Sequence, residues 1–172
     1  MNFDRAGTGD IDALHVLVES AYRGESARRG WTHEADLLGG QRTDARALRE
    51  IITADRQVIL LARNGPDIAG CVQLSHVGEG LAYLGLLTVD PALQASGLGK
   101  LLLAESERFV RDHWQAKAIE MTVIRQRTDL IAYYERRGYV RTGELRPFPH
   151  GDERFGRPKS PELEFAVLRK PL

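Results

Sequence analysis

The chain has 172 residues and a mass of 19.2 kDa, the size of one domain, and 42% of its residues are hydrophobic, enough for a buried core. Its 24 Lys and Arg residues balance 24 Asp and Glu residues, so no net charge attracts nucleic acid or an anionic membrane over distance. These figures exclude a disordered chain and argue against a non-specific nucleic-acid-binding protein.

The single cysteine, Cys71, cannot form an intrachain disulfide, so nothing indicates an oxidising compartment. Cys71 lies in a strand-like run, which predicts a small buried side chain rather than a nucleophile. The sequence after Met1 has no apolar core of a signal peptide, and no later stretch has the length of a membrane span. We therefore expect a cytoplasmic protein with no membrane partner.

The N-terminal third predicts two helices separated by a loop. Thr43 and Asp44 offer a cap for the second helix, which continues through Ile52. Between the helices, residues 22–43 are rich in Gly, Arg, Thr and acidic residues, a composition typical of a mobile loop. The first helix follows Asp10 and has apolar residues at helical spacing: Ile11, Leu14, Leu17, Val18 and Ala21.

The middle of the chain predicts three strands. A hairpin is expected from the strand patterns at residues 58–62 and 68–74, which flank a turn at 64–67. The third strand spans residues 81–89 and ends at Asp90-Pro91.

The C-terminal half predicts a βαβ unit and two more strands. After residues 97–99 a helical pattern runs to about Trp114, and a buried strand at 118–124 would pair parallel to the strand at 81–89. Thr128 or Asp129 caps a short helix through Arg137, with Gly138 at its left-handed C-terminal position. The last strands are expected at 139–145 and 163–168, which gives an α/β chain with a mixed sheet.

A glycine-containing loop joins the strand that ends at Val89 to the helix that follows it. Such a loop directs backbone N–H groups into one concavity at the positive end of the helix dipole, where a pyrophosphate would fit. A nucleotide P-loop would need glycine at Gln94 and Ser or Thr at Leu101, and a dinucleotide fingerprint would need glycine at Leu102. The sequence departs from both motifs.

The loop resembles the Gln/Arg-x-x-Gly-x-Gly/Ala motif of the GNAT superfamily of acetyl-CoA-dependent N-acetyltransferases, spelled here by Gln94, Gly97 and Gly99. The preceding strand, the long helix after the loop and the later run 132–139 also resemble the family. The resemblance implies a single GNAT-type domain over residues 1–172. Its sheet would be central, mixed and mostly antiparallel, with flanking helices and a splayed parallel strand pair, and Gly85 is a candidate for the strand distortion.

The resemblance also assigns roles to residues. Backbone groups of the segment Leu87, Thr88 and Val89 would bond the acetyl and pantetheine amides. Tyr134 is placed at the coenzyme sulfur, and a phenol with a pKa of about 10 stays protonated at neutral pH and can donate a proton to the leaving thiolate. Tyr133 and Tyr139 are expected in the core. The pyrophosphate would lie on the loop residues Gln94, Ala95, Ser96, Gly97, Leu98, Gly99 and Lys100.

Two departures from the family pattern concern the chemistry. Arg127 stands where many members have an asparagine that contacts the coenzyme, and arginine would instead bind a phosphate. The strand 84–89 has no glutamate to relay the amine's proton, so the general base is unidentified. His76 and Glu79 are candidates for it, although a polar hairpin tip accounts for both.

The acceptor would lie on segments that the fold leaves variable. Trp31 offers an aromatic face to a protonated amine, with Glu34 and Asp36 as charge partners, whereas the neighbouring Arg28 and Arg29 suit a carboxylate. The proline-rich segment 147–158 predicts a stiff wall or lid.

Together these features predict direct transfer of acetyl from acetyl-CoA to an amine, with a small molecule as partner. The alternatives are a CoA-responsive binding or regulatory module without turnover, and a protein N-terminal or lysine acetyltransferase. A homodimer is left open, and no metal site and no nucleic-acid partner are predicted.

Overall fold

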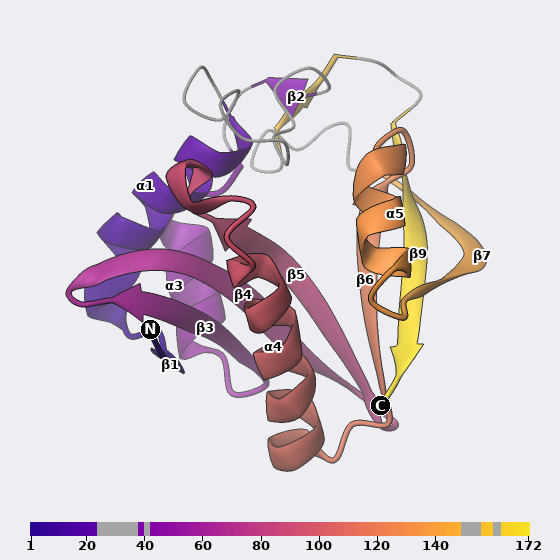
Figure 1. Cartoon of the computed structure of the whole chain (residues 1–172), viewed down its shortest axis with the longest axis horizontal. Coiled ribbons are helices and arrows are strands. Elements are labelled where there is room, and N and C mark those ends of the chain that lie inside the picture. The colour runs from indigo at the N-terminus through magenta and orange to yellow at the C-terminus, as the bar shows by residue number, and fades with distance from the viewer. Residues whose placement is uncertain (24–37, 40–41, 149–155, 160–162) are drawn as a thin grey trace.

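A seven-stranded mixed sheet runs through the centre of the molecule (Figure 1). The computed structural model describes residues 1–23, 38–39, 42–148, 156–159 and 163–172. The strand order is β1-β3-β4-β5-β6-β9-β7, and among the neighbouring pairs of this sheet only β5 and β6 are parallel. The strands are Asn2–Arg5 (β1), Gln57–Asn64 (β3), Asp67–Gly78 (β4), Leu81–Val89 (β5), Ala118–Ile124 (β6), Val140–Pro147 (β7) and Glu164–Pro171 (β9).

Helices cover both faces of the sheet. The helices α1 (Ile11–Tyr22) and α3 (Ala45–Thr53) lie behind the sheet in Figure 1, and α4 (Leu98–Trp114) lies in front of it. The shorter helix α5 (Thr128–Glu135) lies beside β6. The expected cap of α3 is confirmed, because the Asp44 side chain accepts a hydrogen bond of 2.7 Å from the backbone N–H of Ala47.

The hydrophobic core has one part on each face of the sheet. Leu102 and Val110 of α4 pack with Ile119 on one face, and Leu14 of α1 packs with Leu48 of α3 on the other. Helix α4 approaches the sheet closely at Gly70, where an added Cβ would lie 2.9 Å from Leu102 Cδ1 of α4 and 2.7 Å from the Thr88 carbonyl oxygen of β5. A side chain at this position would therefore push the helix away from β4.

The parallel strands β5 and β6 diverge along their length. They pair only where Leu81–Tyr83 faces Ala118–Glu120, and Figure 1 shows them meeting near the C-terminus and separating toward their far ends. The pairing of β5 with β4 also shifts register between Gly85 and Thr88. The distortion was expected at Gly85, but it lies one residue further on, at Leu86, whose φ is +53°. The splayed parallel pair itself is confirmed.

Several element boundaries differ from the sequence-based expectation. Strand β4 continues to Gly78 instead of ending at Leu74. Helix α5 has Arg127 at its N-cap and ends at Glu135, so neither Thr128 nor Asp129 is the cap. The reason is that the Arg127 carbonyl already accepts the first helical hydrogen bond, from the N–H of Ile131. Gly138 has the expected left-handed conformation, with a φ of +93°.

Three short strands were not anticipated. Strand β1 pairs with β3, and a separate two-residue ladder joins β2 (Leu38–Gly39) to β8 (Arg157–Pro158). All three pair with strands far along the chain, so no local periodicity of their own marks them. No helix in the described part of the chain combines the length and the apolar character needed to cross a membrane.

Candidate active site

The loop between β5 and α4 is held open by two residues with positive φ. The Asp90 side chain accepts from the Ala92 N–H at 2.9 Å and starts the 3₁₀ turn Pro91–Leu93. Ala95 (φ +68°) and Gly97 (φ +88°) then turn the chain so that α4 begins at Leu98. The first-turn N–H groups of a helix have no intrahelical acceptor and lie at the positive end of its dipole. The loop therefore has the geometry of an anion-binding site.

A cavity of about 210 Å³, here called the loop cavity, opens against this turn. An added Cβ at Gly97 would meet nothing within 4 Å, so the cradle above it is open for a ligand. An added Cβ at Gly99 would instead lie 3.0 Å from the Tyr133 hydroxyl, so Gly99 makes room for α5. These features fit a bound pyrophosphate. The lining includes the predicted loop residues Gln94, Ala95, Gly97, Gly99 and Lys100 together with Val89.

A second cavity of about 320 Å³, here called the inner cavity, lies between the diverging strands. Four residues, Tyr22, Leu87, Leu130 and Tyr134, line both cavities and mark the boundary between them. The described residues that line only the inner cavity are Arg42, Gln73, Tyr83, Leu84, Gly85, Leu86, Met121, Thr122, Val123, Ile124, Arg127, Phe148 and Phe165.

Tyr134, which was predicted from the sequence to meet the coenzyme sulfur, lies at this boundary. Its side chain is buried, and its ring packs edge-on against Tyr133 and Tyr139, with centroids 5.4 and 6.0 Å away. These contacts fix the ring while its position on α5 brings it to both cavities. On the opposite side, the Tyr22 hydroxyl donates to the Leu87 carbonyl.

The backbone at Leu87 departs from the regular ladder of β5 because of the strand distortion. Leu86 and Leu87 fall within the register shift between β4 and β5, and β6 pairs with β5 only at Leu81–Tyr83. The segment predicted to bond the acetyl and pantetheine amides is therefore outside the regular ladder at Leu87. Thr88 lines neither cavity; its hydroxyl is buried and donates to the Leu86 carbonyl at 2.9 Å.

Several residues predicted to contact the coenzyme or the acceptor do not line the loop cavity. Leu98 is buried in the core, and the Ser96 N–H donates to the Leu93 carbonyl; neither residue lines a cavity. Arg127 is buried against the inner cavity and is not part of the loop-cavity lining, so the structure does not bring it to the phosphate loop. The predicted acceptor residues Trp31, Glu34 and Asp36, and most of the segment 147–158, lie outside the described residues.

The described lining of the two cavities contains no carboxylate and no histidine. His76 lies on β4, within 3.1 Å of an Arg56 nitrogen and stacked on Trp114, and Glu79 lies in the β4–β5 turn. Both match the structural interpretation as a polar hairpin end, and neither lines a cavity. The general base therefore stays unidentified among the described residues.

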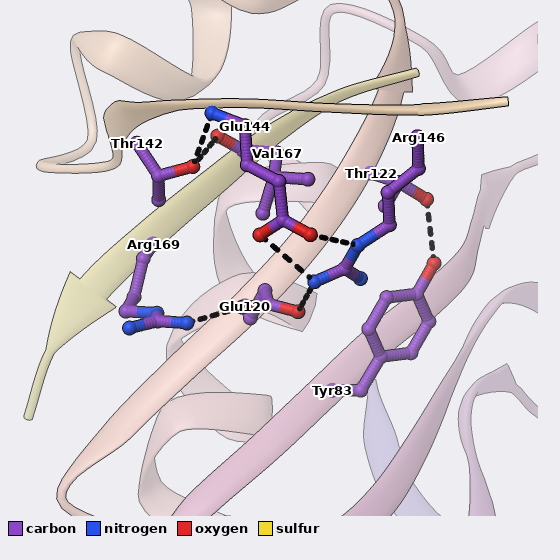
Figure 2. Close-up of polar contacts among 8 residues, drawn as sticks. All are labelled: Tyr83, Glu120, Thr122, Thr142, Glu144, Arg146, Val167 and Arg169. Atoms are coloured by element: carbon purple, nitrogen blue, oxygen red, sulfur yellow. Dashed lines mark hydrogen bonds and ion pairs between the residues drawn. The ribbon is translucent and has the colours of Figure 1, made fainter. Parts of the chain in front are cut away.

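The buried carboxylate of Glu120 is engaged elsewhere. Figure 2 shows it between Arg146 and Arg169, at 2.8 and 2.7 Å, while the Tyr83 and Thr122 hydroxyls bond each other at 2.7 Å. Cys71 is fully buried, and burial raises the pKa of its thiol to about 12. A thiol in this state is not a nucleophile at neutral pH, in agreement with the sequence-based interpretation.

Several lining residues were missed from the sequence. Tyr133 was assigned to the core, but it is half-buried, lines the loop cavity and lies beneath the Arg137 guanidinium at 3.5 Å. Arg137 follows Tyr133 by four residues and lies just past the C-terminal end of α5, and this spacing could have indicated the pair. Arg42, Phe148 and the other inner-cavity residues come from distant segments, and no local sequence signal joins them.

Comparison with known proteins agrees with this geometry. The sequence profile of the Acetyltransferase (GNAT) family matches residues 25–139, more than half of the chain. No curated protein matches the sequence.

Solved structures share the fold at low sequence identity. The ribosomal-protein-S18-alanine N-acetyltransferase of Escherichia coli is 17% identical with a TM-score of 0.69, covering 99% of this chain and 92% of that one. A spermidine N-acetyltransferase chimera from Vibrio cholerae and hSSAT is 13% identical with a TM-score of 0.70, covering 99% and 96%. A Bacillus anthracis structure in complex with acetyl coenzyme A is 20% identical with a TM-score of 0.58, covering 72% and 66%. The chain belongs to the GNAT family and is an acetyl-CoA-dependent N-acetyltransferase.

Proposed function

We propose that the protein transfers the acetyl group of acetyl-CoA directly to the amine of a small molecule. The observation that carries the proposal is the meeting of two cavities at Leu87 and Tyr134, one opening on the phosphate loop and the other reaching between the splayed strands. A coenzyme held in the loop cavity would present its thioester at this boundary, and an amine would reach it from the inner cavity.

Binding of the coenzyme would rest on the backbone of the loop and of β5. The first-turn N–H groups of α4 and the Lys100 side chain would face the pyrophosphate, with Gly97 leaving the approach open. Backbone groups of Leu87 and Val89 would align the pantetheine arm. This arrangement accelerates the reaction chiefly by holding amine and thioester in one orientation.

Tyr134 would act as the general acid. The amine nitrogen attacks the thioester carbonyl carbon, the carbon–sulfur bond breaks, and Tyr134 donates its hydroxyl proton to the leaving thiolate while the amine's proton passes to solvent. The buried Cys71 takes no part, because its raised pKa keeps it protonated and it does not act as an acyl-accepting nucleophile.

A small acceptor is supported by the size and lining of the inner cavity. Its volume of about 320 Å³ falls within the range of small-molecule sites, and Phe148 and Phe165 contribute apolar walls. The fold alone does not select the acceptor, since the similar structures include both a ribosomal-protein and a spermidine acetyltransferase. A cytoplasmic location stays a prediction, and a homodimer stays open.

The second candidate is a CoA-responsive regulatory module, favoured by the lack of a carboxylate or histidine in the described cavity lining. A screen of amines that follows CoA release, run beside calorimetry with acetyl-CoA, separates the two. Turnover of a small amine supports the proposal. Tight acetyl-CoA binding without acetylation of any amine supports the regulatory module.

A further inference from the structure

The charge of the inner cavity distinguishes between classes of amine. Among its described lining residues the charged side chains are Arg42 and Arg127, and both are positive. The polar remainder consists of neutral groups, mainly hydroxyls and the Gln73 amide. A polyamine or a lysine-rich peptide carries several positive charges, and such a lining would repel it.

Three carboxylates described on the neighbouring elements make contacts outside the cavity. The Glu19 carboxylate of α1 accepts the backbone N–H groups of Arg42 and Thr43 at 2.6 and 2.9 Å. On β6, Glu120 is held between two arginines outside the cavity (Figure 2). Glu164 of β9 pairs with Arg125 at 2.7 Å. None of these three acids is among the lining residues.

The two arginines differ in burial. Arg127 is 6% exposed and lies at the N-cap of α5, where its backbone N–H donates to the Ile124 carbonyl at 2.9 Å. Arg42 is half-buried, and its guanidinium lies over the Tyr22 ring at 5.2 Å, at the boundary of the two cavities. A guanidinium offers five N–H donors in a planar fork that matches a carboxylate, so each can bind a ligand in addition to its contacts within the protein.

We propose that the acceptor is an amine that also carries a carboxylate, as in a free amino acid, and that Arg42 and Arg127 bind this carboxylate. The inference rests on the proposed acetyl transfer and specifies its substrate class. The carboxylate end would lie against the arginines, which leaves the amine facing the Leu87–Tyr134 boundary.

The test compares each of the twenty amino acids with its primary amide, and includes spermidine as a polyamine. CoA release is measured at saturating acetyl-CoA. We expect kcat/KM for an accepted amino acid to exceed that of its amide by roughly tenfold or more, the effect of losing a charge-assisted hydrogen-bonded pair. Equal or better use of amides or of spermidine overturns the substrate class while leaving acetyl transfer intact. Acetyl-CoA binding with no amine acetylated overturns the proposed function itself.

Variants connect the preference to the two arginines. Arg42→Gln and Arg127→Lys should raise the KM for the amino acid and reduce its advantage over the amide, with the KM for acetyl-CoA unchanged. Arg46→Gln is the matched control, because Arg46 lies on exposed α3 surface paired with Glu50. Arg127 was predicted from the sequence to bind a phosphate of the coenzyme. If Arg127→Lys raises only the acetyl-CoA KM and Arg42→Gln changes neither constant, the carboxylate site is overturned.

Discussion

Replacing Tyr134 by phenylalanine removes the proposed proton donor and keeps the ring. The ring is 7% exposed and is held edge-on by Tyr133 and Tyr139, contacts that phenylalanine also makes. Loss of a positioned general acid typically costs about 10²–10⁴ in rate, which corresponds to roughly 3–5 kcal/mol of transition-state stabilisation. Loss of the hydrogen bonds of the Tyr134 hydroxyl should lower the free energy of unfolding by no more than about 1.5 kcal/mol.

Steady-state kinetics of CoA release on an identified amine give kcat and kcat/KM, and calorimetry gives the acetyl-CoA dissociation constant. We expect kcat and kcat/KM to fall together, with acetyl-CoA affinity and melting temperature nearly unchanged. Tyr139→Phe is the matched control. Tyr139 is buried, its hydroxyl donates to Glu107 at 3.1 Å, and it lines neither cavity.

The control should lose stability of about 1 kcal/mol and keep its activity. Wild-type turnover in Tyr134→Phe would refute the assignment, since the sulfur would then take its proton from another source such as water. An equal loss of activity in both variants would mean that packing of the aromatic cluster, and not proton donation, is responsible.

Three further predictions test the loop, the thiol and the buried ion pair. Gly97→Ala and Gly143→Ala place alanine at nearly equal φ, +88° and +86°, in open space, so both should lose about 1–2 kcal/mol in chemical denaturation. Only Gly97→Ala should also weaken acetyl-CoA binding, by roughly tenfold in calorimetry; equal binding by both would remove the loop from the coenzyme site. Cys71→Ala should retain activity. Burial raises the pKa of the Cys71 thiol from 9.0 to about 12, so the folded state holds this proton more tightly than the unfolded state does. The contribution of the thiol to the free energy of unfolding is therefore complete below pH 9 and is lost as the pH rises toward 12. The wild type should therefore lose more stability than Cys71→Ala over this range, and parallel pH profiles would contradict the buried protonated thiol. Glu120→Gln should lower the free energy of unfolding by about 1–3 kcal/mol. This figure is reduced for solvent screening because the two arginine partners are 37% and 47% exposed. An unchanged midpoint of urea denaturation would show that the ion-pair network does not stabilise the fold.

Local patterns were sufficient for most elements of the sheet and for the loop. The hairpin of β3 and β4, the unit of β5, α4 and β6, and the cap at Asp44 each depend on residues close together in the sequence. The candidate phosphate loop could be predicted for the same reason, because its glycines and the helix that follows are contiguous. Tyr134 was placed by a short motif, and the structure brings it to the boundary of both cavities.

The inner cavity could not be derived in this way. Arg42, Arg127 and Phe148 come from three separate segments, and the Tyr22 hydroxyl reaches a carbonyl 65 residues away. Such contacts depend on strand register and on how helices pack, and neither is encoded by the identity of neighbouring residues. Edge strands such as β1 are found only through their distant partners.

The sequence by itself determined the strand–loop–helix between β5 and α4, because its residues are contiguous. It also predicted, through a motif that resembles the GNAT family, that Tyr134 meets the coenzyme sulfur. Tertiary structure decided where β5 distorts, at Leu86, and which charged side chains line the inner cavity. The physical reason is that the register shift and the divergence of β5 from β6 arise from pairing across the sheet. That pairing creates the space between the strands, and there Arg42 and Arg127 line one cavity although they are 85 residues apart in the sequence.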